Sequence, residues 1–416
     1  MSSEMTNSEQ NKKDILIRVP ALRFPEFLEG KEWQEKQLYS VCQMKAGKFI
    51  SASKINTQHI EGLYPCYGGN GLRGFTSEYS HSGEYSLIGR QGALCGNVNF
   101  VTGRFYATEH AVVVSPNKKI NNNWLFYCLN KLNLNQYAIG QAQPGLSVNF
   151  LEKIVIQIPE QEKEQQKIAD CLSSLDNVIS LQAQKIDALH HYKNGMMQKL
   201  FPEDGEKIPG LRFSEFKNEG GWEEKKFNDI AIFFKGKGIS KSDIVQDGKI
   251  QCIRYGELYT HYNETINTII SKTDIPESEL FLSRQNDVII PSSGETKWDI
   301  ATASCVMVNK VALGSDLNII RTNENGVFIS YYLNSAKRYD ISKIAQGDTV
   351  VHLYSSQLKL LNLLLPPKRE EQQKIADCLS SLDKLINTEI KKLASLKNHK
   401  TGLMQQLFPE MDEVNA

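Results

Sequence analysis

Apolar residues recur every three or four positions along two long segments of the chain. In 168–200 and again in 375–407, eight of the ten positions that follow a strict four–three alternation hold Ile, Leu or Met. Sustained over more than four heptads, this spacing places one apolar stripe on a helix and predicts a coiled coil. Prolines flank both segments, where helices tolerate them. We therefore predict two helices of about 40 residues, each roughly 60 Å long.

Each apolar stripe has two polar interruptions at equivalent places. They are Gln182 and Lys193 in the first segment, and Glu389 and Lys400 in the second. An antiparallel pair in full overlap would set the charged interruptions against Leu or Ile, which is costly unless they snorkel. A shift of one heptad pairs Lys193 with Glu389 and Gln182 with Lys400, so we predict the shifted register. The alternative is that these residues face solvent or another subunit. The shift would also release four apolar residues to pack on the adjoining domains: Ile168, Leu172, Ile375 and Leu379.

The chain carries the same motifs twice. Pro20-Ala-Leu-Arg-Phe-Pro-Glu-Phe27 recurs 189 positions later as Pro209-Gly-Leu-Arg-Phe-Ser-Glu-Phe216, and Trp33 recurs as Trp222. The thirteen residues 164–176 reappear unchanged at 371–383, and Phe-Pro-Glu follows both helical segments. Each half therefore consists of an opening motif, a variable block and a repeated helix. The repeated parts indicate a common frame that carries two different attachments.

The variable blocks mix strand-like runs with glycine-rich loops. The runs 85–89, 111–114, 154–159 and 287–291 are typical of strands, 68–71 and 89–97 of loops, and 124–132 and 327–335 of short helices. We predict an α+β fold: two mixed α/β domains related by a pseudo-two-fold internal repeat, separated by two long helices in an antiparallel coiled coil. The expected boundaries are a tail at 1–18, a first domain at 19–158, a central helix at 159–201, a connector and second domain at 202–366, a distal helix at 367–408 and a tail at 409–416.

Composition narrows the class of protein. Apolar residues make up 40% and charged residues 23% of the 416 positions, as in globular proteins. No apolar run approaches the roughly 18–20 residues of a membrane span, and the polar N-terminus does not resemble a signal peptide. We expect a cytoplasmic protein without membrane contact. None of the eight cysteines forms a Cys-x-x-Cys pair, so we expect reduced thiols rather than a zinc site.

The formal net charge of zero hides a local asymmetry. Residues 38–159 contain seven Lys and three Arg against five Glu, a net charge of +5, whereas residues 227–366 have 14 basic and 15 acidic residues. The first block can hold a phosphate backbone by its overall charge. The second block would have to gather its basic residues on one face.

Sequence motifs for catalysis are missing. The segment 236–242, Gly-Lys-Gly-Ile-Ser-Lys-Ser, has the wrong spacing for a phosphate-binding loop. There is no Asn-Pro-Pro-aromatic run of the kind found in amino-methyltransferases, no convincing Asp…Glu-x-Lys nuclease cluster and no metal-ligand spacing. We expect the chain to bind no cofactor or metal and to perform no catalysis by itself.

The duplicated motifs resemble those of a known family. The Pro-x-Leu-Arg-Phe-x-Glu-Phe openings, the block ends at 140–147 and 347–352, and the Glu-Gln-x-x-Ile-Ala helices ending in Phe-Pro are similar to specificity (HsdS) subunits of type I restriction–modification enzymes over about residues 19–410. The resemblance implies that each block is a target recognition domain, which reads half of a bipartite double-stranded DNA target in the major groove. It implies that the antiparallel helices set the gap, and that the partners are two S-adenosylmethionine-dependent methyltransferase subunits and two ATP-dependent restriction and translocation subunits. One departure is the second block end, Gly-Asp-Thr-Val-Val-His in place of a Gln-Pro-x-Leu-Ser form; we expect the same structural role.

Candidate DNA contacts follow from loop position and side-chain chemistry. Arginine pairs with guanine, asparagine or glutamine with adenine, and a carboxylate accepts from cytosine, while lysines contact phosphates. The alternative for each residue is a solvated or turn-stabilising role. In the first block the candidates are Asn70, Arg73, Arg90, Gln91 and Asn97 for bases and Lys45 and Lys48 for phosphates. In the second they are Arg254, Tyr255, Ser292, Ser293, Glu295 and Lys297 for bases and Lys235, Lys237 and Lys241 for phosphates.

Two other functions compete with DNA reading. A coiled-coil scaffolding protein without DNA specificity would keep the helices but bind only protein, and a gel-shift assay with the methyltransferase complex would distinguish it. A self-sufficient enzyme would methylate or cut DNA without partner subunits, and the missing motifs argue against it.

Overall fold

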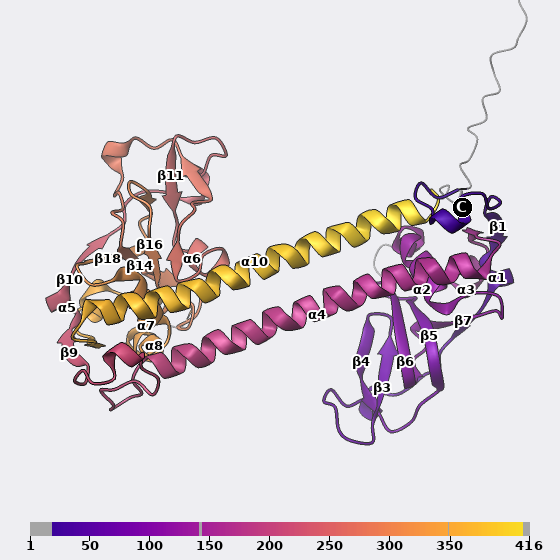
Figure 1. The fold of residues 1–416 in the computed structure, drawn as a ribbon, viewed down its shortest axis with the longest axis horizontal. Helices are drawn as coiled ribbons and strands as arrows, with labels where there is room; N and C mark the ends of the chain where they lie inside the picture. The colour runs from indigo at the N-terminus through magenta and orange to yellow at the C-terminus, as the bar shows by residue number, and fades with distance from the viewer. Residues whose placement is uncertain (1–18, 141–143, 348, 411–416) are drawn as a thin grey trace, which may run out of the picture. The chain divides into compact units, whose positions relative to one another are not determined.

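The computed structural model describes residues 19–140, 144–347 and 349–410. The chain divides into two compact units: unit 1 runs to Ala183 and resumes at Lys392, and unit 2 is Gln184–Lys391. Two long helices, α4 (Glu162–Leu200) and α10 (Arg369–Leu407), contribute segments to both units (Figure 1). Among the described residues, no helix is both long and apolar enough to span a bilayer.

Unit 1 is built on a six-stranded sheet with the order β2-β7-β5-β6-β3-β4. Only β3 and β6 pair in parallel. Strand β7, between β2 and β5, opens with the run Ala-Val-Val-Val, which is buried on both faces. Its β-branched residues favour such a strand. The elements are β1 (Gln34–Gln37), α1 (Leu38–Val41), β2 (Cys42–Ala46), β3 (Tyr64–Gly68), β4 (Gly71–Thr76), β5 (His81–Gly89), β6 (Val98–Ala107), β7 (Ala111–Pro116), α2 (Asn122–Lys131), α3 (Val148–Leu151) and β8 (Val155–Ile158), with short 3₁₀ turns at Pro25–Phe27, Ala52–Lys54 and Leu134–Tyr137.

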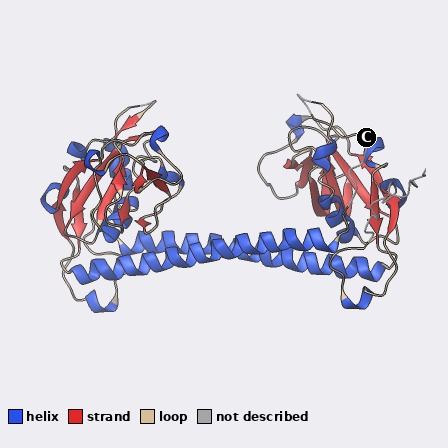
Figure 2. Ribbon diagram, turned by 90° about the horizontal axis from the view of Figure 1, so that it is seen from above, coloured by secondary structure: helices blue, strands red, loops and turns tan. Residues whose placement is uncertain are grey.

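Unit 2 divides its strands among a five-stranded sheet, β10-β18-β14-β16-β12, and smaller sheets β13-β11-β17, β15-β19 and β20-β9. In each unit the strands lie on one side of the helical segments (Figure 2). The elements are β9 (Glu223–Lys226), α5 (Phe227–Ile230), β10 (Ala231–Lys235), β11 (Ile250–Ile253), α6 (Glu257–Thr260), β12 (Thr265–Ile266), β13 (Ser271–Thr273), β14 (Asp287–Pro291), β15 (Ser293–Gly294), β16 (Ser304–Val306), β17 (Ala312–Leu313), β18 (Leu317–Thr322), α7 (Gly326–Asn334), α8 (Arg338–Ile344), β19 (Val351–His352), α9 (Ser355–Leu358) and β20 (Asn362–Leu365), with 3₁₀ turns at Ser214–Phe216, Lys241–Asp243 and Glu277–Glu279.

The two units repeat one topology. The order β2-β7-β5-β6 in unit 1 corresponds to β10-β18-β14-β16 in unit 2. The parallel pair β3–β6 aligns Cys66 with Tyr106, and its counterpart β11–β17 aligns Cys252 with Ala312. The predicted α+β architecture with an internal repeat is confirmed, and so are the predicted strands and short helices.

The ends of the long helices close the cores of the units. Phe408, after α10, lies 6.2 Å from Trp33 between ring centroids in unit 1. Phe201, after α4, lies 6.4 Å from Trp222 in unit 2. The repeated Phe-Pro motif therefore supplies a buried aromatic ring to each core. Four helix residues are buried in these same cores: Ile168 and Leu172 in unit 1, and Ile375 and Leu379 in unit 2.

The helices pair antiparallel within each unit, but the predicted register is wrong. In unit 2, Lys193 Nζ lies 2.7 Å from Asp383 Oδ1, and Glu389 binds Lys185 instead of Lys193. In unit 1, Lys400 binds Asp176. These contacts follow the full-overlap register. Each charged interruption reaches the oppositely charged residue next to the apolar position that faces it, so no shift is needed.

Candidate nucleic-acid interface

An Arg–Glu–Trp anchor joins each opening motif to the first turn of a long helix. In unit 1, Arg23 Nε donates to Glu164 Oε1 at 2.7 Å and Trp33 Nε1 donates to the same oxygen at 3.2 Å. In unit 2, Arg212 Nε and Nη2 donate to the two oxygens of Glu371 at 2.8 and 2.7 Å. Trp222 Nε1 donates to Glu371 at 3.3 Å. The bond to Glu371 raises the pKa of Arg212.

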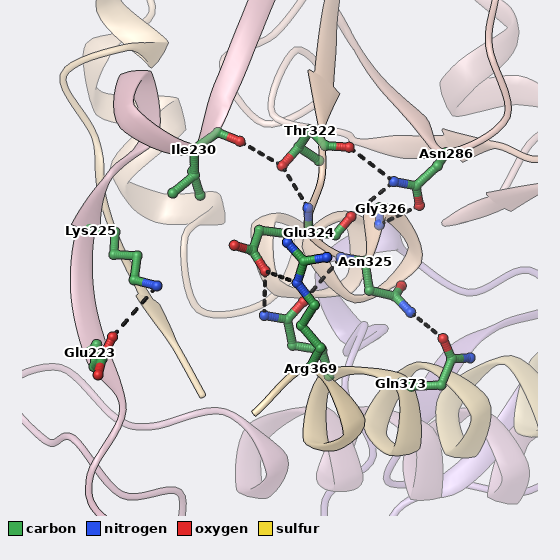
Figure 3. A network of polar contacts seen from close by, with 11 residues as sticks. Glu223, Lys225, Ile230, Asn286, Thr322, Glu324, Asn325, Gly326, Arg369 and Gln373 are labelled. Atoms are coloured by element: carbon green, nitrogen blue, oxygen red, sulfur yellow. Dashed lines mark hydrogen bonds and ion pairs between the residues drawn. The ribbon is translucent and has the colours of Figure 1, made fainter. Parts of the chain in front are cut away.

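Two glutamines that follow each anchor carboxylate hold a short helix of the same unit. In unit 2, Gln372 Oε1 accepts from the backbone N–H of Asn325 at 3.0 Å, and Gln373 Oε1 accepts from the Asn325 side chain at 2.7 Å (Figure 3). The Asn325 side chain also caps α7 by accepting from Phe328 N. Gln372 donates to Glu324 at 2.9 Å.

The same glutamine clamp occurs in unit 1. Gln165 accepts from the backbone N–H of Asn121 at 2.9 Å, and Gln166 accepts from its side chain at 2.6 Å. Asn121 caps α2 by accepting from Trp124 N. The unchanged Glu-Gln-Gln of both helices is therefore explained by three equivalent contacts, one to an opening motif and two to the asparagine that caps a short helix.

A Lys–Asp–Tyr cluster forms a further equivalent contact. In unit 1, Asp176 accepts from Tyr127 at 2.7 Å and from Lys400 at 2.6 Å. In unit 2, Asp383 accepts from Tyr331 and pairs with Lys193. Burial and the bond to Asp176 raise the pKa of Tyr127.

Lys193 has one more partner than its counterpart in unit 1. Its ammonium lies 2.8 Å from Glu264 as well as close to Asp383, and its side chain is 10% exposed. Burial alone would lower the pKa of Lys193, but the charges of Glu264 and Asp383 outweigh it and raise the pKa. This buried cation therefore remains charged.

The β3–β4 hairpin, the segment after β5 and the turn before β7 surround a hollow of about 340 Å³ in unit 1. Three sequence-predicted residues line it: Asn70, Arg73 and Gln91. Asn70 and Arg73 are exposed. Gly69 is required at the wall, because a Cβ there would lie 2.6 Å from the Gln91 carbonyl oxygen. His110, which the sequence reasoning missed, also lines the hollow.

The other predicted residues of unit 1 lie around this hollow or apart from it. Arg90 is half-buried and lines an adjoining hollow together with Gln91. Asn97 is exposed, but its carbonyl accepts from Gly89 N and closes the β5–β6 loop rather than lining the hollow. Lys45 and Lys48 are exposed, on β2 and just after it.

Unit 2 forms a counterpart of this loop cluster with different side chains. By strand register, Arg254 and Tyr255 occupy the positions of Gly68, the last residue of β3, and of Gly69. Arg254 pairs with Glu257 at 3.4 Å. Its guanidinium is therefore partly engaged within the unit.

The β14 loop supplies the remaining predicted base contacts. Ser292 is buried, and Ser293 donates to Asp316 at 3.3 Å. Glu295 and Lys297 are exposed in the loop that follows. The predicted phosphate contacts Lys235, Lys237 and Lys241 are all exposed.

Backbone hydrogen bonds establish that the two loop clusters are equivalent. Arg90 N donates to His110 O at 3.0 Å in unit 1, and Ser292 N donates to Asp316 O at 2.8 Å in unit 2. Leu146 N donates to Arg90 O, and Leu353 N donates to Ser292 O. We call these clusters cradle 1 and cradle 2. Cradle 1 consists of the segments after β3 and β5, the turn before β7 and the block end of unit 1. Cradle 2 consists of the segments after β11 and β14, the turn before β18 and the block end of unit 2.

The two block ends have the same structural role, as expected from their sequence positions. Gly145 bridges Gln91 and Ile139, while His352 bridges Ser293 and Gln346. Gly140 and Gly347 have φ of 110° and 105°, the left-handed conformation that favours glycine. Residues 141–143 and 348 of these motifs lie outside the described residues.

A further repeat, inside the variable blocks, was missed by the sequence reasoning. Gly47-Lys48-x-Ile50-Ser51 recurs 189 positions later, from Gly236 to Ser240. Lys48 N donates to Ala107 O at 3.0 Å and Lys237 N to Leu313 O at 2.9 Å. The offset that aligns the opening motifs would have revealed it. These segments place Lys48 and Lys237 equivalently, beside the two cradles.

In 19–140, 144–347 and 349–410, no three His, Cys, Asp or Glu residues gather as a metal site would require. Six of the eight cysteines are buried singly as thiols, and burial raises the pKa of Cys42 to about 12.

Comparisons with known proteins agree on one family. The model of the type I restriction modification DNA specificity domain matches residues 30–191 and 219–398. The EcoprrI type I restriction enzyme specificity subunit of Escherichia coli is 52% identical over 134 residues, which is 32% of this chain and 33% of that protein. The MjaVIII specificity subunit of Methanocaldococcus jannaschii is 24% identical over 437 residues, 95% of this chain and 96% of that protein. The crystal structure of a type I S subunit from M. genitalium has the same fold, with a TM-score of 0.65 at 18% identity over 95% of this chain and 100% of that one.

Proposed function

The chain belongs to the type I restriction–modification specificity family, and we propose that it reads a bipartite DNA target, one half with each recognition domain. The observation that carries this proposal is the pair of cradles. The same backbone hydrogen bonds hold both, yet the side chains at equivalent positions differ. A common frame with unlike reading residues suits a target whose two halves have different sequences.

The side chains of cradle 1 suit direct reading of base edges. Asn70, Gln91 and Arg73 line one hollow, and their amide and guanidinium groups match adenine and guanine edges in the major groove. Lys45 and Lys48 are the proposed phosphate contacts nearby. In cradle 2 the proposed base contacts are Arg254, Tyr255, Ser292, Ser293, Glu295 and Lys297, and the proposed phosphate contacts are Lys235, Lys237 and Lys241.

The proposed role of the chain is recognition without catalysis. Two methyltransferase subunits would dock on the helical frame, and restriction and translocation subunits would join through the complex. The helices would set the gap between the half-sites, since a helix lengthens by 1.5 Å for each added residue.

A domain exchange tests the proposal. Residues 38–158 are replaced by the matching block of another family member, and the complex with methyltransferase subunits is mapped by single-molecule methylation sequencing. The Arg23–Glu164 anchor lies outside the exchanged block and is retained. We expect one half of the target to change and the other to stay. A target that changes in both halves, or in neither, contradicts the proposal.

A further inference from the structure

One position of the cradle has no side chain in unit 1 and a histidine side chain in unit 2. Gly145 and His352 are equivalent, because each bridges the loop after β5 or β14 and the start of its own block end. In unit 1, Gly145 lines the adjoining hollow of about 260 Å³ together with Arg90 and Gln91. In unit 2 the equivalent residue, His352, carries an imidazole.

The surroundings of His352 hold its ring in a defined position. Its Nδ1 lies 3.4 Å from Ser293 Oγ, a proposed base contact. Its ring stacks on the exposed Tyr354, with 6.2 Å between centroids and 21° between planes. The backbone on both sides is fixed, since His352 pairs with Ser293 in β15–β19 and exchanges hydrogen bonds of 2.7 and 2.9 Å with Gln346. A side chain held in this way loses little rotamer freedom when it binds.

We propose that His352 is a specificity-determining residue of the second recognition domain, and that Gly145 leaves the equivalent contact unmade in the first. This inference rests on the proposed function. The imidazole has one ring nitrogen engaged with Ser293, and the other can hydrogen-bond a base edge. That nitrogen pairs only with the opposite hydrogen-bonding group, so it distinguishes base edges that present a donor from those that present an acceptor.

Reciprocal substitutions test the role of this position. His352→Ala removes the imidazole and keeps a β-carbon for strand pairing. Gly145→His adds one where there is room, because a Cβ there would meet its nearest atom, Arg90 O, at 3.6 Å. Gly220→His is the matched control: no atom lies within 4 Å of its Cβ, and the site is outside the cradles.

Each variant is assembled with the methyltransferase subunits and assayed on a library of randomised half-sites. For His352→Ala we expect discrimination at one base pair of one half-site to fall about tenfold, a typical loss for one base contact. For Gly145→His we expect a changed preference in the other half-site, and for Gly220→His no change. Thermal unfolding midpoints check that each variant folds.

The outcomes separate this inference from the proposed function. If both variants fold and every base preference is unchanged, or if both halves change equally, the role of His352 is refuted. If the exchange of residues 38–158 also leaves the target unchanged, the proposed function fails as well. If the domain exchange changes one half and His352→Ala changes nothing, only the role of His352 fails.

Discussion

Removing the arginine of one anchor should destabilise one unit and spare the other. Arg212 and Glu371 form a bidentate pair whose side chains are 5% and 1% exposed. Arg212→Ala leaves the carboxylate buried, with Trp222 Nε1 as the side-chain donor that remains at 3.3 Å. Breaking a buried pair by removing one partner costs about 3–5 kcal/mol. Arg212 Nη1 also donates to the carbonyl of Glu219 at 2.8 Å. The substitution therefore also removes a hydrogen bond that joins the opening motif to the segment before β9.

Hydrogen exchange read by mass spectrometry resolves the two units, which need not unfold together. We expect Arg212→Ala to lower the opening free energy of the protected amides in β14 and β18 by about 3–5 kcal/mol. The opening free energies of the amides of β5 and β7 in unit 1 should not change. Arg23→Ala is the matched variant and should produce the reverse pattern, because Arg23 binds Glu164 in the same geometry.

A double-substitution cycle and an exposed pair complete the design. Glu371→Gln removes the buried charge, so the double variant with Arg212→Ala should be more stable than the sum of the single losses predicts. Lys31→Ala breaks an exposed pair, 80% and 43% accessible, and should cost at most about 1 kcal/mol. If Arg212→Ala costs no more than Lys31→Ala, or if the losses in the cycle simply add, the anchor does not stabilise unit 2 as argued.

Three further predictions concern the helices and the thiols. Lys193→Met leaves Glu264 and Asp383 without their shared cation and should destabilise unit 2 by about 3 kcal/mol or more. Lys374→Met breaks a pair with Glu215 in which both side chains are 50% exposed, and should cost less than about 1 kcal/mol in the same denaturation assay; equal losses would contradict the buried role of Lys193. Inserting one heptad, about 10 Å, into both α4 and α10 should lengthen the gap in methylation maps and leave each half-site sequence intact; an active variant with the original gap would argue against helix length as the determinant. At pH 8, iodoacetamide should modify the half-buried Cys171 and Cys378 before Cys42, whose thiol is buried and has a pKa raised to about 12; peptide mapping that finds Cys42 modified as fast would refute this.

The helical frame was predictable because its signals lie close together in the sequence. The apolar stripe predicts both long helices, and the unchanged residues 164–176 and 371–383 indicate which helix segments hold the domains. The partners within the frame, such as Arg23 with Glu164, were not named, since no periodicity links an opening motif to a helix about 140 residues away. The offset of 189 carried one more signal, the Gly-Lys segment shared by both domains.

The register prediction failed for a physical reason that concerns side-chain reach. It assumed that a polar residue in an apolar stripe must face another polar residue across the helices. A lysine carries four methylenes, so its stem can cover an apolar neighbour while its ammonium reaches one position further. Asp176 and Asp383 stand at those positions, each next to a stripe leucine, and both bind lysine in the structure. Sequence patterns that score only the stripe miss such pairs.

The frame and the cradles are held by different kinds of bond, and this difference explains why one is repeated and the other varies. Anchors, clamps and Lys–Asp–Tyr clusters depend on side chains, so substituting any member breaks a contact, and identical residues recur at 164–176 and 371–383. The cradles depend on backbone hydrogen bonds such as Leu146 N to Arg90 O and Leu353 N to Ser292 O. These bonds form whatever side chain is present, so Gly145 and His352 can differ without loss of the loop structure. A recognition site built on main-chain bonds can therefore acquire a new sequence preference by side-chain substitution alone, while the frame that carries it stays unchanged.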